Sequence, residues 1–363
     1  MGEGLSDPKQ RRKGRGAVSN AASARVTAQQ REPAEDGWDT LDAELAERAD
    51  TVVGTDASRS ILTRNQSPDV PFDRSINPYK GCEHGCVYCF ARPTHAYLDL
   101  SPGLDFETRI FAKPNAAELL RTALNKRGYT PDVVTLGANT DPYQPVERRL
   151  RITRTVLEVL AEANHPVCIV TKGAGVARDA DILGEMGRKK LARVMISVTT
   201  LDRELARKLE PRASTPGRRL DALARLTDAG AATGVLAAPM IPAVNDHELE
   251  GIIAAAAKTG AQSAGYVLLR LPHEIKDLFA EWLDAYYPDR KDRVLNRVRA
   301  SRDGALNDST WGQRLTGAGQ YAELLAKRFR IACSKHGLNT NRWDLDTTQF
   351  RPPERDGRQG RLF

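Results

Sequence analysis

Short apolar runs rich in β-branched residues alternate with amphipathic stretches of helical period through the middle of this chain. The runs occupy residues 75–79, 132–137, 167–171, 194–198, 234–238 and 265–269, and the helical stretches occupy 114–127, 153–164, 179–191, 214–229, 246–258 and 273–286. This alternation is typical of right-handed βαβ crossovers, so it predicts a parallel α/β sheet covered by helices. Six units are too few for a closed eight-unit barrel. An open, doubly wound sheet is one arrangement that fits them, because periodicity predicts the elements and not their order in space.

The segment before this repeat differs from it in composition. Residues 1–56 are rich in charged and small residues and nearly free of large apolar ones until Trp38, so they are predicted to form a disordered tail. The basic run in this tail is interpreted as a solvated segment rather than a contact to phosphate backbones. It consists of Lys9, Arg11, Arg12, Lys13 and Arg15.

Residues 57–287 are predicted to form the core domain with an ordered lead-in, and residues 288–363 a helical C-terminal extension. The extension is expected to close one end of the core or to cover the substrate. Its charged helix from Arg290 to Asp303 is interpreted as an exposed face rather than a nucleic-acid site, and Tyr321 to His336 is predicted to be an amphipathic helix. The last residues, Pro352 to Phe363, are expected to be mobile.

Composition favours a globular enzyme in a reducing compartment. The 363 residues are 40% apolar, enough to bury a substantial core. No run approaches the roughly 18 uninterrupted apolar residues that span a bilayer, and the amino terminus is polar and basic where a secretory signal would be apolar. Five cysteines, three of them clustered, do not form a disulfide framework, so a cytoplasmic location without a membrane partner is expected. The net charge of +7, from 54 positive and 47 negative residues, favours nucleic-acid binding only slightly.

The clustered cysteines are Cys82, Cys86 and Cys89, spaced as CxxxCxxC in a segment broken by glycines. Three thiolates at this spacing can converge on one metal centre, because glycine lets the backbone fold back on itself. The segment supplies no obvious fourth ligand, and an open coordination position is what distinguishes a catalytic metal site from a closed structural one. The alternative is a structural zinc site in which His84 or a remote histidine completes a Cys₃His set.

This spacing, with Tyr88 before the last cysteine and Phe90 after it, resembles that of the radical S-adenosylmethionine (SAM) superfamily. The resemblance implies that the three cysteines hold a [4Fe-4S] cluster, whose fourth iron is chelated by the amino and carboxylate groups of SAM. It also implies that Tyr88 or Phe90 lies near the adenine, and that the six units form a partial (β/α)6 TIM-like barrel. The implied reaction is reductive cleavage of SAM to methionine and a 5′-deoxyadenosyl radical that abstracts hydrogen from the substrate.

Polar residues follow the second predicted strand, at the end of a parallel sheet where ligands bind. Asn139, Thr140 and Asp141 can accept hydrogen bonds from an ammonium group, as SAM carries; the alternative is a proline-rich turn with Asx capping. Their position corresponds to the superfamily's amino-group motif. The sequence motif TDPYQPxE resembles that of the branch that includes spore photoproduct lyase, a DNA repair enzyme.

Residues on or after the next two strands extend the resemblance. Lys172 suits the SAM carboxylate, and Ser197 resembles the ribose-contacting position. Glu210 and Arg212 are similar to a recurring element after the fourth strand, in which Arg212 could contact a carboxylate bidentately. The plainer alternatives are an exposed lysine at position 172 and a strand serine that bonds locally.

One position departs from the lyase pattern. The lyase carries a hydrogen-donating cysteine just before the amino-group motif, and the matching residue here is Ala138. Cys168 is not expected to substitute, because it lies in the middle of a strand and is interpreted as a small buried hydrophobe. The departure argues against photoproduct repair.

The leading hypothesis is therefore a radical SAM enzyme with an unidentified substrate, for which nucleic acid is one candidate. An electron donor such as flavodoxin or ferredoxin is an expected partner. The alternative is a zinc- or cluster-stabilised nucleic-acid-binding module without catalysis, with the basic tail and the charged helix as its binding surface.

Overall fold

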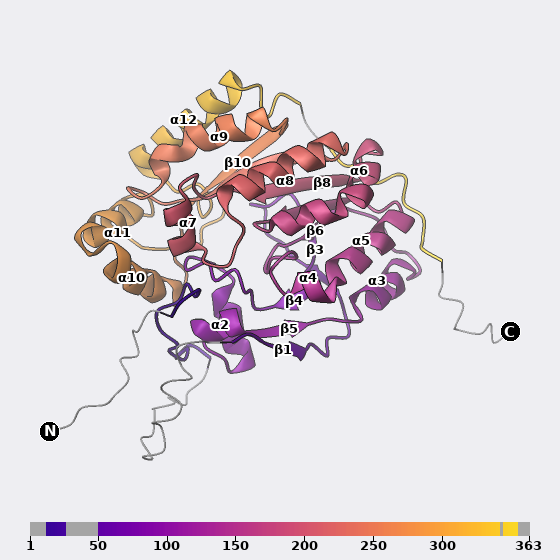
Figure 1. Ribbon diagram of the computed structural model, residues 1–363, viewed down its shortest axis with the longest axis horizontal. Helices are drawn as coiled ribbons and strands as arrows, with labels where there is room; N and C mark the ends of the chain where they lie inside the picture. The colour runs from indigo at the N-terminus through magenta and orange to yellow at the C-terminus, as the bar shows by residue number, and fades with distance from the viewer. Residues whose placement is uncertain (1–11, 27–49, 342–343, 355–363) are drawn as a thin grey trace, which may run out of the picture.

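The six predicted strands form one curved sheet in chain order. The computed structural model describes residues 12–26, 50–341 and 344–354 (Figure 1). Its seven-stranded sheet has the order β10-β9-β8-β7-β6-β3-β2. The strands are β2 (Leu62–Arg64), β3 (Arg74–Ile76), β6 (Val134–Leu136), β7 (Val167–Thr171), β8 (Ala192–Ser197), β9 (Ala232–Met240) and β10 (Ser263–Leu268). All neighbours from β3 to β10 pair in parallel, and β2 adds an antiparallel edge. A doubly wound sheet would reverse its order midway, so that alternative is wrong.

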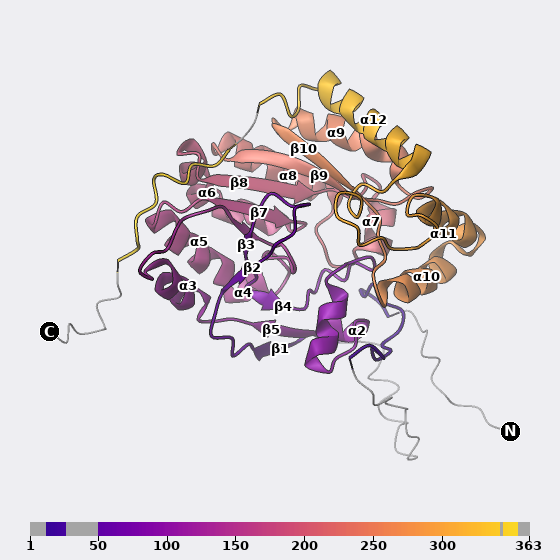
Figure 2. The same cartoon turned by 180° about the vertical axis from the view of Figure 1, so that it is seen from behind.

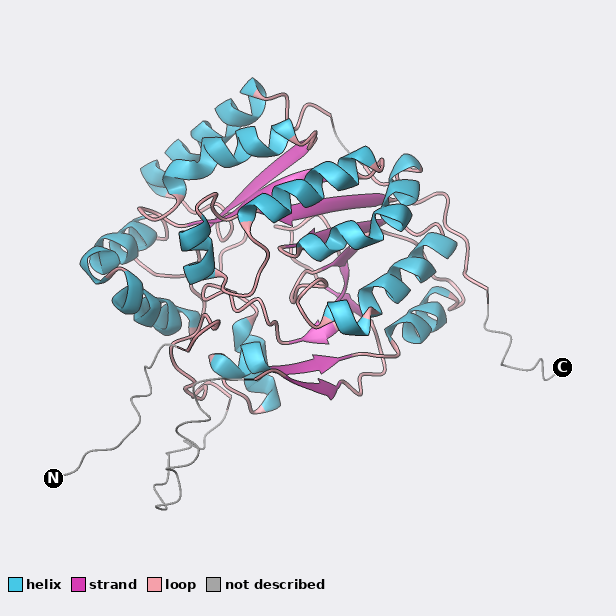
Figure 3. Ribbon diagram, viewed as in Figure 1, coloured by secondary structure: helices cyan, strands magenta, loops and turns pink. Residues whose placement is uncertain are grey.

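Helices between the strands cover the outer face of this sheet (Figures 1 and 3). They are α3 (Ala116–Leu124), α5 (Ile152–Glu162), α6 (Ala180–Arg188), α8 (Pro216–Asp228) and α9 (Leu249–Lys258). Alternate residues of β7 show the two faces: Ile169 is buried beneath the helices, whereas Cys168 and Val170 on the inner face are only half-buried. Singly wound order with one helical layer is the arrangement expected for a partial (β/α)6 barrel.

A smaller sheet lies beside the carboxyl ends of the barrel strands, in the order β1-β5-β4. Its strands are β1 (Val52–Thr55), β4 (Tyr79–Lys80) and β5 (Arg109–Ala112), and the short helices η1 (Arg92–Leu98) and α2 (Leu104–Thr108) connect the last two. The predicted first strand at 75–79 is therefore divided. Its beginning joins the barrel as β3, and Tyr79 turns away into the small sheet.

The amino-terminal segment is ordered where the structure describes it, so the prediction of a disordered tail over residues 1–56 is wrong for residues 12–26 and 50–56. Ala17 and Val18 are buried, and so is Arg15, which was interpreted as solvated. The segment is fixed by polar contacts, since the backbone amides of Gly16 and Ala17 donate to the Glu107 carboxylate at 2.9 and 2.8 Å. Low apolar content gave no sign of this anchoring. The tail residues Lys9, Arg11 and Trp38 lie outside the described residues.

The C-terminal extension begins after α10 (Ile275–Tyr286) with η4 (Pro288–Arg290) and α11 (Lys291–Ala300), and it ends its helical part with α12 (Gly319–Lys335). The gap between β10 and β2, hereafter the seam, is filled by the loop between α11 and α12. The amide of Leu268 on β10 donates to Leu315 at 2.8 Å, and Arg314 pairs with Asp69 in the β2–β3 loop. The extension therefore closes the side of the barrel.

Residues 344–354 run along the opposite, amino-terminal end of the strands (Figure 2). The amides of Asp346 and Arg351 donate to the carbonyls of Lys190 and Ala163, which lie in the connections that lead into β8 and β7. Asn339 occupies the free edge of β10, where its side chain bonds both the amide and the carbonyl of Ala264, at 2.9 and 3.0 Å. The expected mobility of residues 352–363 can be compared only to Glu354, because 355–363 lie outside the described residues. Within the described ranges, no helix combines the length and apolar character needed to cross a membrane.

Candidate active site

The three clustered cysteines lie in the loop between β4 and η1, residues 81–91, hereafter the cysteine loop. Backbone hydrogen bonds fix it at both ends: Cys82 donates to Phe106 at 2.9 Å and Val87 to Leu209 at 3.1 Å. The loop turns back on itself at Gly81 and Gly85, whose φ angles of 77° and 67° suit glycine. It therefore spans from the small sheet to the helix after β8, across the carboxyl ends of the barrel strands.

The three thiols share one enclosed site. Cys82 and Cys86 are buried and Cys89 is half-buried. Burial raises the pKa of each thiol, and the charge of Asp141 at Cys82 and of Glu210 at Cys86 raises it further. Without a metal these side chains are neutral thiols, so coordination has to displace their protons.

A fourth protein ligand does not complete this set. His84 is turned to Asp141, with its Nδ1 atom 3.3 Å from Oδ2. Among the residues that the structure describes, no group of three or more His, Cys, Asp or Glu side chains, the three cysteines included, is placed so that it could hold a single metal ion. Zinc needs its sulfurs about 4 Å apart around one ion, whereas cluster ligands bind separate irons and stand wider. By their chemistry, three thiols with no fourth donor among the described residues suit a cluster that leaves one iron open, and His84 does not form the predicted Cys₃His alternative.

Buried charges behind the cysteine loop brace it. Arg92 donates from Nε to the Cys86 carbonyl at 2.8 Å and pairs with Glu107, and both side chains are fully buried. Glu107 in turn accepts the amides of Gly16 and Ala17. A Cβ atom at Gly16 would lie 1.7 Å from the Gly85 carbonyl oxygen, so the amino-terminal segment rests directly on the loop backbone. Sequence reasoning missed these residues, because no periodicity marks a contact between segments so far apart.

The loop after β6 holds its predicted site residues through contacts within the protein. Asp141 accepts from the Thr171 hydroxyl at 2.6 Å, from the Lys172 amide at 2.7 Å and from the Tyr143 amide at 2.8 Å. The last of these is the Asx turn that the plainer interpretation expects. Burial raises the pKa of Asp141, but the charge of His84 and these hydrogen bonds outweigh it and lower the pKa to about 2.

The other two residues of this loop are fixed less completely. Thr140 donates its hydroxyl to the Tyr79 carbonyl at 2.7 Å, and the amide of Asn139 donates to the Asn77 side chain at 3.0 Å. Asn139 is half-buried, and its side chain makes no hydrogen bond with any described residue. Of the three, Asn139 alone keeps its side-chain polar atoms available.

Lys172 and Ser197 meet at the carboxyl ends of β7 and β8. The Lys172 ammonium donates to Ser197 Oγ at 3.0 Å, and it lies 5.7 Å from the centroid of the Tyr88 ring in the cysteine loop. Lys172 is therefore not the plain exposed lysine of the alternative interpretation. It joins the strand ends to the segment that carries Cys86 and Cys89.

Glu210 holds this arrangement from behind. It is buried and accepts hydrogen bonds from Tyr88 and Thr199, and it pairs with the buried Arg219. Burial raises the pKa of Glu210, but the charges of Arg219 and Lys172 outweigh it and lower the pKa to about 2. Sequence reasoning missed Arg219, although it shares the apolar face of α8 with Ala222, Leu223 and Leu226, and a charged residue on such a face is a detectable signal.

Arg212 lies apart from this group. It donates to Glu83 at 3.0 Å and lines a hollow of about 160 Å³ outside the barrel, between the cysteine loop and α8. Arg148, Arg178 and Arg218 line the same hollow. The predicted bidentate contact to SAM is therefore not supported by the placement of Arg212.

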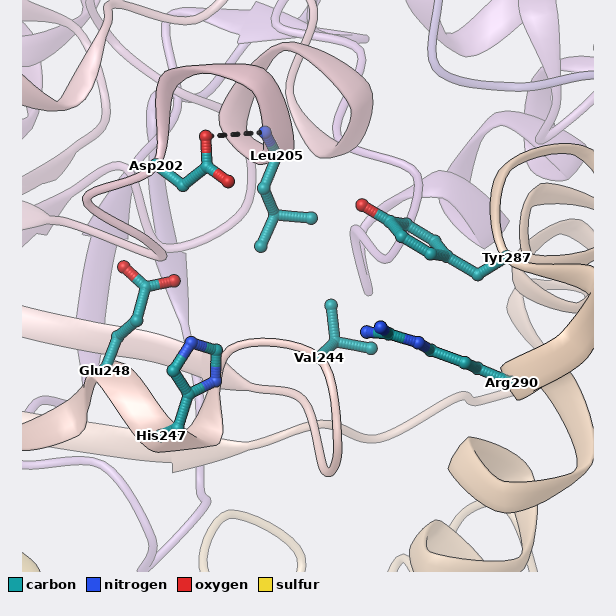
Figure 4. Close-up of a pocket in the computed structure, with 7 residues that line it drawn as sticks. All are labelled: Asp202, Leu205, Val244, His247, Glu248, Tyr287 and Arg290. Atoms are coloured by element: carbon teal, nitrogen blue, oxygen red, sulfur yellow. Dashed lines mark hydrogen bonds between the residues drawn. The ribbon is translucent and has the colours of Figure 1, made fainter.

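A larger hollow of about 420 Å³ lies where the loops after β8 and β9 meet η4 (Figure 4). Its two carboxylates are engaged within the protein: Asp202 caps α7 (Arg203–Leu209), and Glu248 accepts from Thr200 and Leu201. None of the predicted site residues lines it. We therefore place the candidate site at the cysteine loop.

The structure also places Ala138 and Cys168, the two residues considered for the position of the lyase's hydrogen-donating cysteine. Ala138 is half-buried in the loop after β6, where the lyase pattern has its donor. Cys168 is half-buried on the inner face of β7 beside Arg193, so it is more exposed than the small buried hydrophobe that the sequence predicts. It lies four residues before Lys172, deep in the barrel, and does not replace the missing donor at the strand ends.

Comparison with known proteins agrees with this geometry. The family model described as the radical SAM superfamily matches residues 76–256. An uncharacterized protein of Mycobacterium tuberculosis is 37% identical over 235 residues, which is 63% of this chain and 68% of the relative. An uncharacterized protein of Methanocaldococcus jannaschii is 24% identical over 229 residues, covering 62% of this chain and 81% of its own.

Solved structures of spore photoproduct lyase share the fold. One variant superposes with a TM-score of 0.56 at 18% identity, covering 85% of this chain and 86% of the lyase. Another, with AdoMet and a dinucleoside spore photoproduct bound, has a TM-score of 0.56 at 17% identity and covers 86% of each chain. The chain therefore belongs to the radical SAM superfamily, and it is an enzyme of that class with the fold of spore photoproduct lyase.

Proposed function

We propose that this enzyme holds a [4Fe-4S] cluster on Cys82, Cys86 and Cys89 and uses it to cleave SAM reductively. When bound, the cluster and SAM supply a 5′-deoxyadenosyl radical that abstracts hydrogen from the substrate. The single observation that carries the proposal is that three enclosed thiols, with no fourth ligand from the part of the chain that the structure describes, lie close to the Lys172 ammonium.

The residues around the thiols suit distinct tasks in binding SAM. Lys172 offers a cation to the carboxylate, and the Ser197 hydroxyl beside it suits the ribose. Tyr88 presents its ring to this space while Glu210 holds its hydroxyl. Glu210 is assigned to positioning, because its oxygens are occupied by protein donors.

The amino group of SAM is assigned to the loop after β6. The Asp141 carboxylate has about four acceptor positions, and protein donors fill them. Asp141 therefore orders the loop, and the contact to the ammonium falls to the Asn139 side chain and to the loop's carbonyls, with Thr140 fixing the loop to β4.

The substrate is proposed only by class. Nucleic acid is a candidate, since related folds include a lyase solved with a dinucleoside photoproduct. Photoproduct repair is not proposed, because Ala138 cannot return a hydrogen atom. Electron delivery is assigned to a flavodoxin or ferredoxin.

The decisive experiment measures 5′-deoxyadenosine. The full chain is purified without oxygen, reconstituted with iron and sulfide, reduced with dithionite and given SAM. Wild type is expected to form 5′-deoxyadenosine, and Cys86→Ala to form none, since the loss of one of three ligands releases the cluster. Cys333→Ala, a buried cysteine on α12, is the matched control and should keep wild-type formation. If wild type with full iron and sulfide content forms no 5′-deoxyadenosine, the proposal is wrong.

A further inference from the structure

Three arginines gather at the seam, with Asp69 beside one of them and Asp308 near another. They are Arg270 just after β10, Arg302 after α11, and Arg314, hereafter the seam arginines. Arg314 pairs with Asp69, whose negative charge reduces the electrostatic repulsion among the arginines. Arg302 is buried, and its donors are taken by the carbonyls of Leu268, Leu269 and Arg314. Burial and the charge of Arg270 lower the pKa of Arg302 to about 10.

Arg270 is the member of this group with unused donors. Its guanidinium makes no hydrogen bond or ion pair with any residue that the structure describes, although the side chain is half-buried. Burial and the charge of Arg314 lower its pKa. A half-buried cation that lacks acceptors costs free energy, and a bound anion would offset it.

The position of Arg270 connects it to the cysteine loop. Its guanidinium lies 5.1 Å from the centroid of the Phe90 ring, and Phe90 directly follows Cys89. The flanking Leu269 and Leu271 pack in one hydrophobic cluster with Cys86 and Tyr88. Phe90 is 48% exposed, so a ligand can approach both the ring and the guanidinium from solvent.

We propose that Arg270 binds a phosphate group of the substrate beside the exposed ring of Phe90, an inference that rests on the proposed function. The guanidinium fork matches a phosphate bidentately. Asp69 pairs with Arg314 and Asp308 lies near Arg302, so among the seam arginines Arg270 is left with its positive charge uncompensated by an ion pair, which suits a phosphate. The phosphate comes either from a free phosphorylated molecule or from the phosphodiester backbone of a nucleic acid strand.

The test is a titration of the full, anaerobically reconstituted chain with three probes: inorganic phosphate, a thymidine hexanucleotide and acetate. Phosphate, the hexanucleotide or both should bind, and acetate should not. Arg270→Gln is expected to weaken that binding at least about tenfold, and Arg270→Lys, which keeps the charge without the fork, to recover part of it. Binding of the hexanucleotide alone identifies a strand as the source, and comparable binding of inorganic phosphate identifies a free molecule.

Arg148→Gln is the matched control, because Arg148 is exposed, its side chain makes no hydrogen bond or ion pair with a described residue, and it lines the other basic hollow. It should bind as wild type does. The inference is overturned if neither phosphate probe binds, if acetate binds as well, if Arg270→Gln binds normally, or if Arg148→Gln loses as much. Wild type that forms 5′-deoxyadenosine without Arg270-dependent binding overturns this inference alone. If wild type binds a phosphate probe through Arg270 but forms no 5′-deoxyadenosine, the proposed function is wrong instead.

Discussion

Lys172 is the residue whose proposed role in SAM binding can be tested most directly. Its ammonium has one hydrogen bond, to Ser197, and one ring contact, to Tyr88, so donors remain for a ligand. Burial raises the pKa of both Cys86 and Cys89, and the charge of Lys172 opposes that rise at each of them. A single side chain thus acts on both the proposed cluster and the proposed cosubstrate.

Replacing Lys172 with Met should raise the KM for SAM about tenfold or more, because a charge-assisted hydrogen bond to the carboxylate is lost. The measurement is 5′-deoxyadenosine formation against SAM concentration. Lys327→Met on the exposed face of α12 provides the control. An unchanged KM in Lys172→Met would remove Lys172 from the SAM site.

At the scale of elements, the sequence pattern was sufficient where strands are buried and regular. The run at 167–171 coincides with β7, because its β-branched residues alternate between the helix layer and the inner face. The prediction of one strand over residues 75–79 was wrong, because apolar character does not show that Tyr79 pairs with β5 in the small sheet. The sequence pattern also failed at residues 12–26, since Gly16 and Ala17 are held through backbone amides, which every sequence possesses. Among site residues, the cysteine spacing was local and detectable, whereas the partnership of Glu210 with Arg219 depends on how α8 packs.

The C-terminal segment 344–354 makes the amino-terminal end of the barrel sensitive to acid. His165, just before β7, is buried against Phe350 and bonds Tyr129 at 2.8 Å. Burial lowers the pKa of His165 to about 4, from an ordinary 6.5. The unfolded chain therefore takes up a proton at a higher pH than the folded chain. The stabilisation is complete above pH 6.5 and is lost progressively as the pH falls to about 4.

Urea unfolding should show this loss as about 3 kcal/mol between pH 7 and pH 4. His165→Gln should reduce the slope of unfolding free energy against pH in that window. His247→Gln, an exposed histidine, should leave the slope unchanged. Equal slopes in wild type and His165→Gln would contradict the assignment.

Over the whole molecule, the candidate site depends on chain segments from both ends. The amino-terminal segment covers the cysteine loop at Gly85, and the extension supplies Arg302 and Arg314, the two seam arginines next to Arg270. The barrel strands present Lys172 and Ser197 between them. The cysteine loop is therefore enclosed by parts of the chain that lie outside the repeat.

Deleting residues 1–26 should destabilise the folded protein by roughly 3 kcal/mol or more, because two hydrogen bonds to the buried Glu107 carboxylate are lost. Iron retained per chain after reconstitution should fall with it. A chain lacking only residues 1–11 keeps every contact described for this segment and should retain wild-type iron. Equal iron content in both shortened proteins would show that the segment does not support the cysteine loop.

The last strand of an unclosed barrel would ordinarily offer its outer edge to another molecule. Here the Leu315 carbonyl occupies the amide of Leu268, and the Asn339 side chain occupies the amide and carbonyl of Ala264. Both ends of the row of hydrogen-bonding groups that could recruit a foreign strand are thereby bound within the same polypeptide. The protein can leave its barrel incomplete without becoming prone to edge-to-edge aggregation.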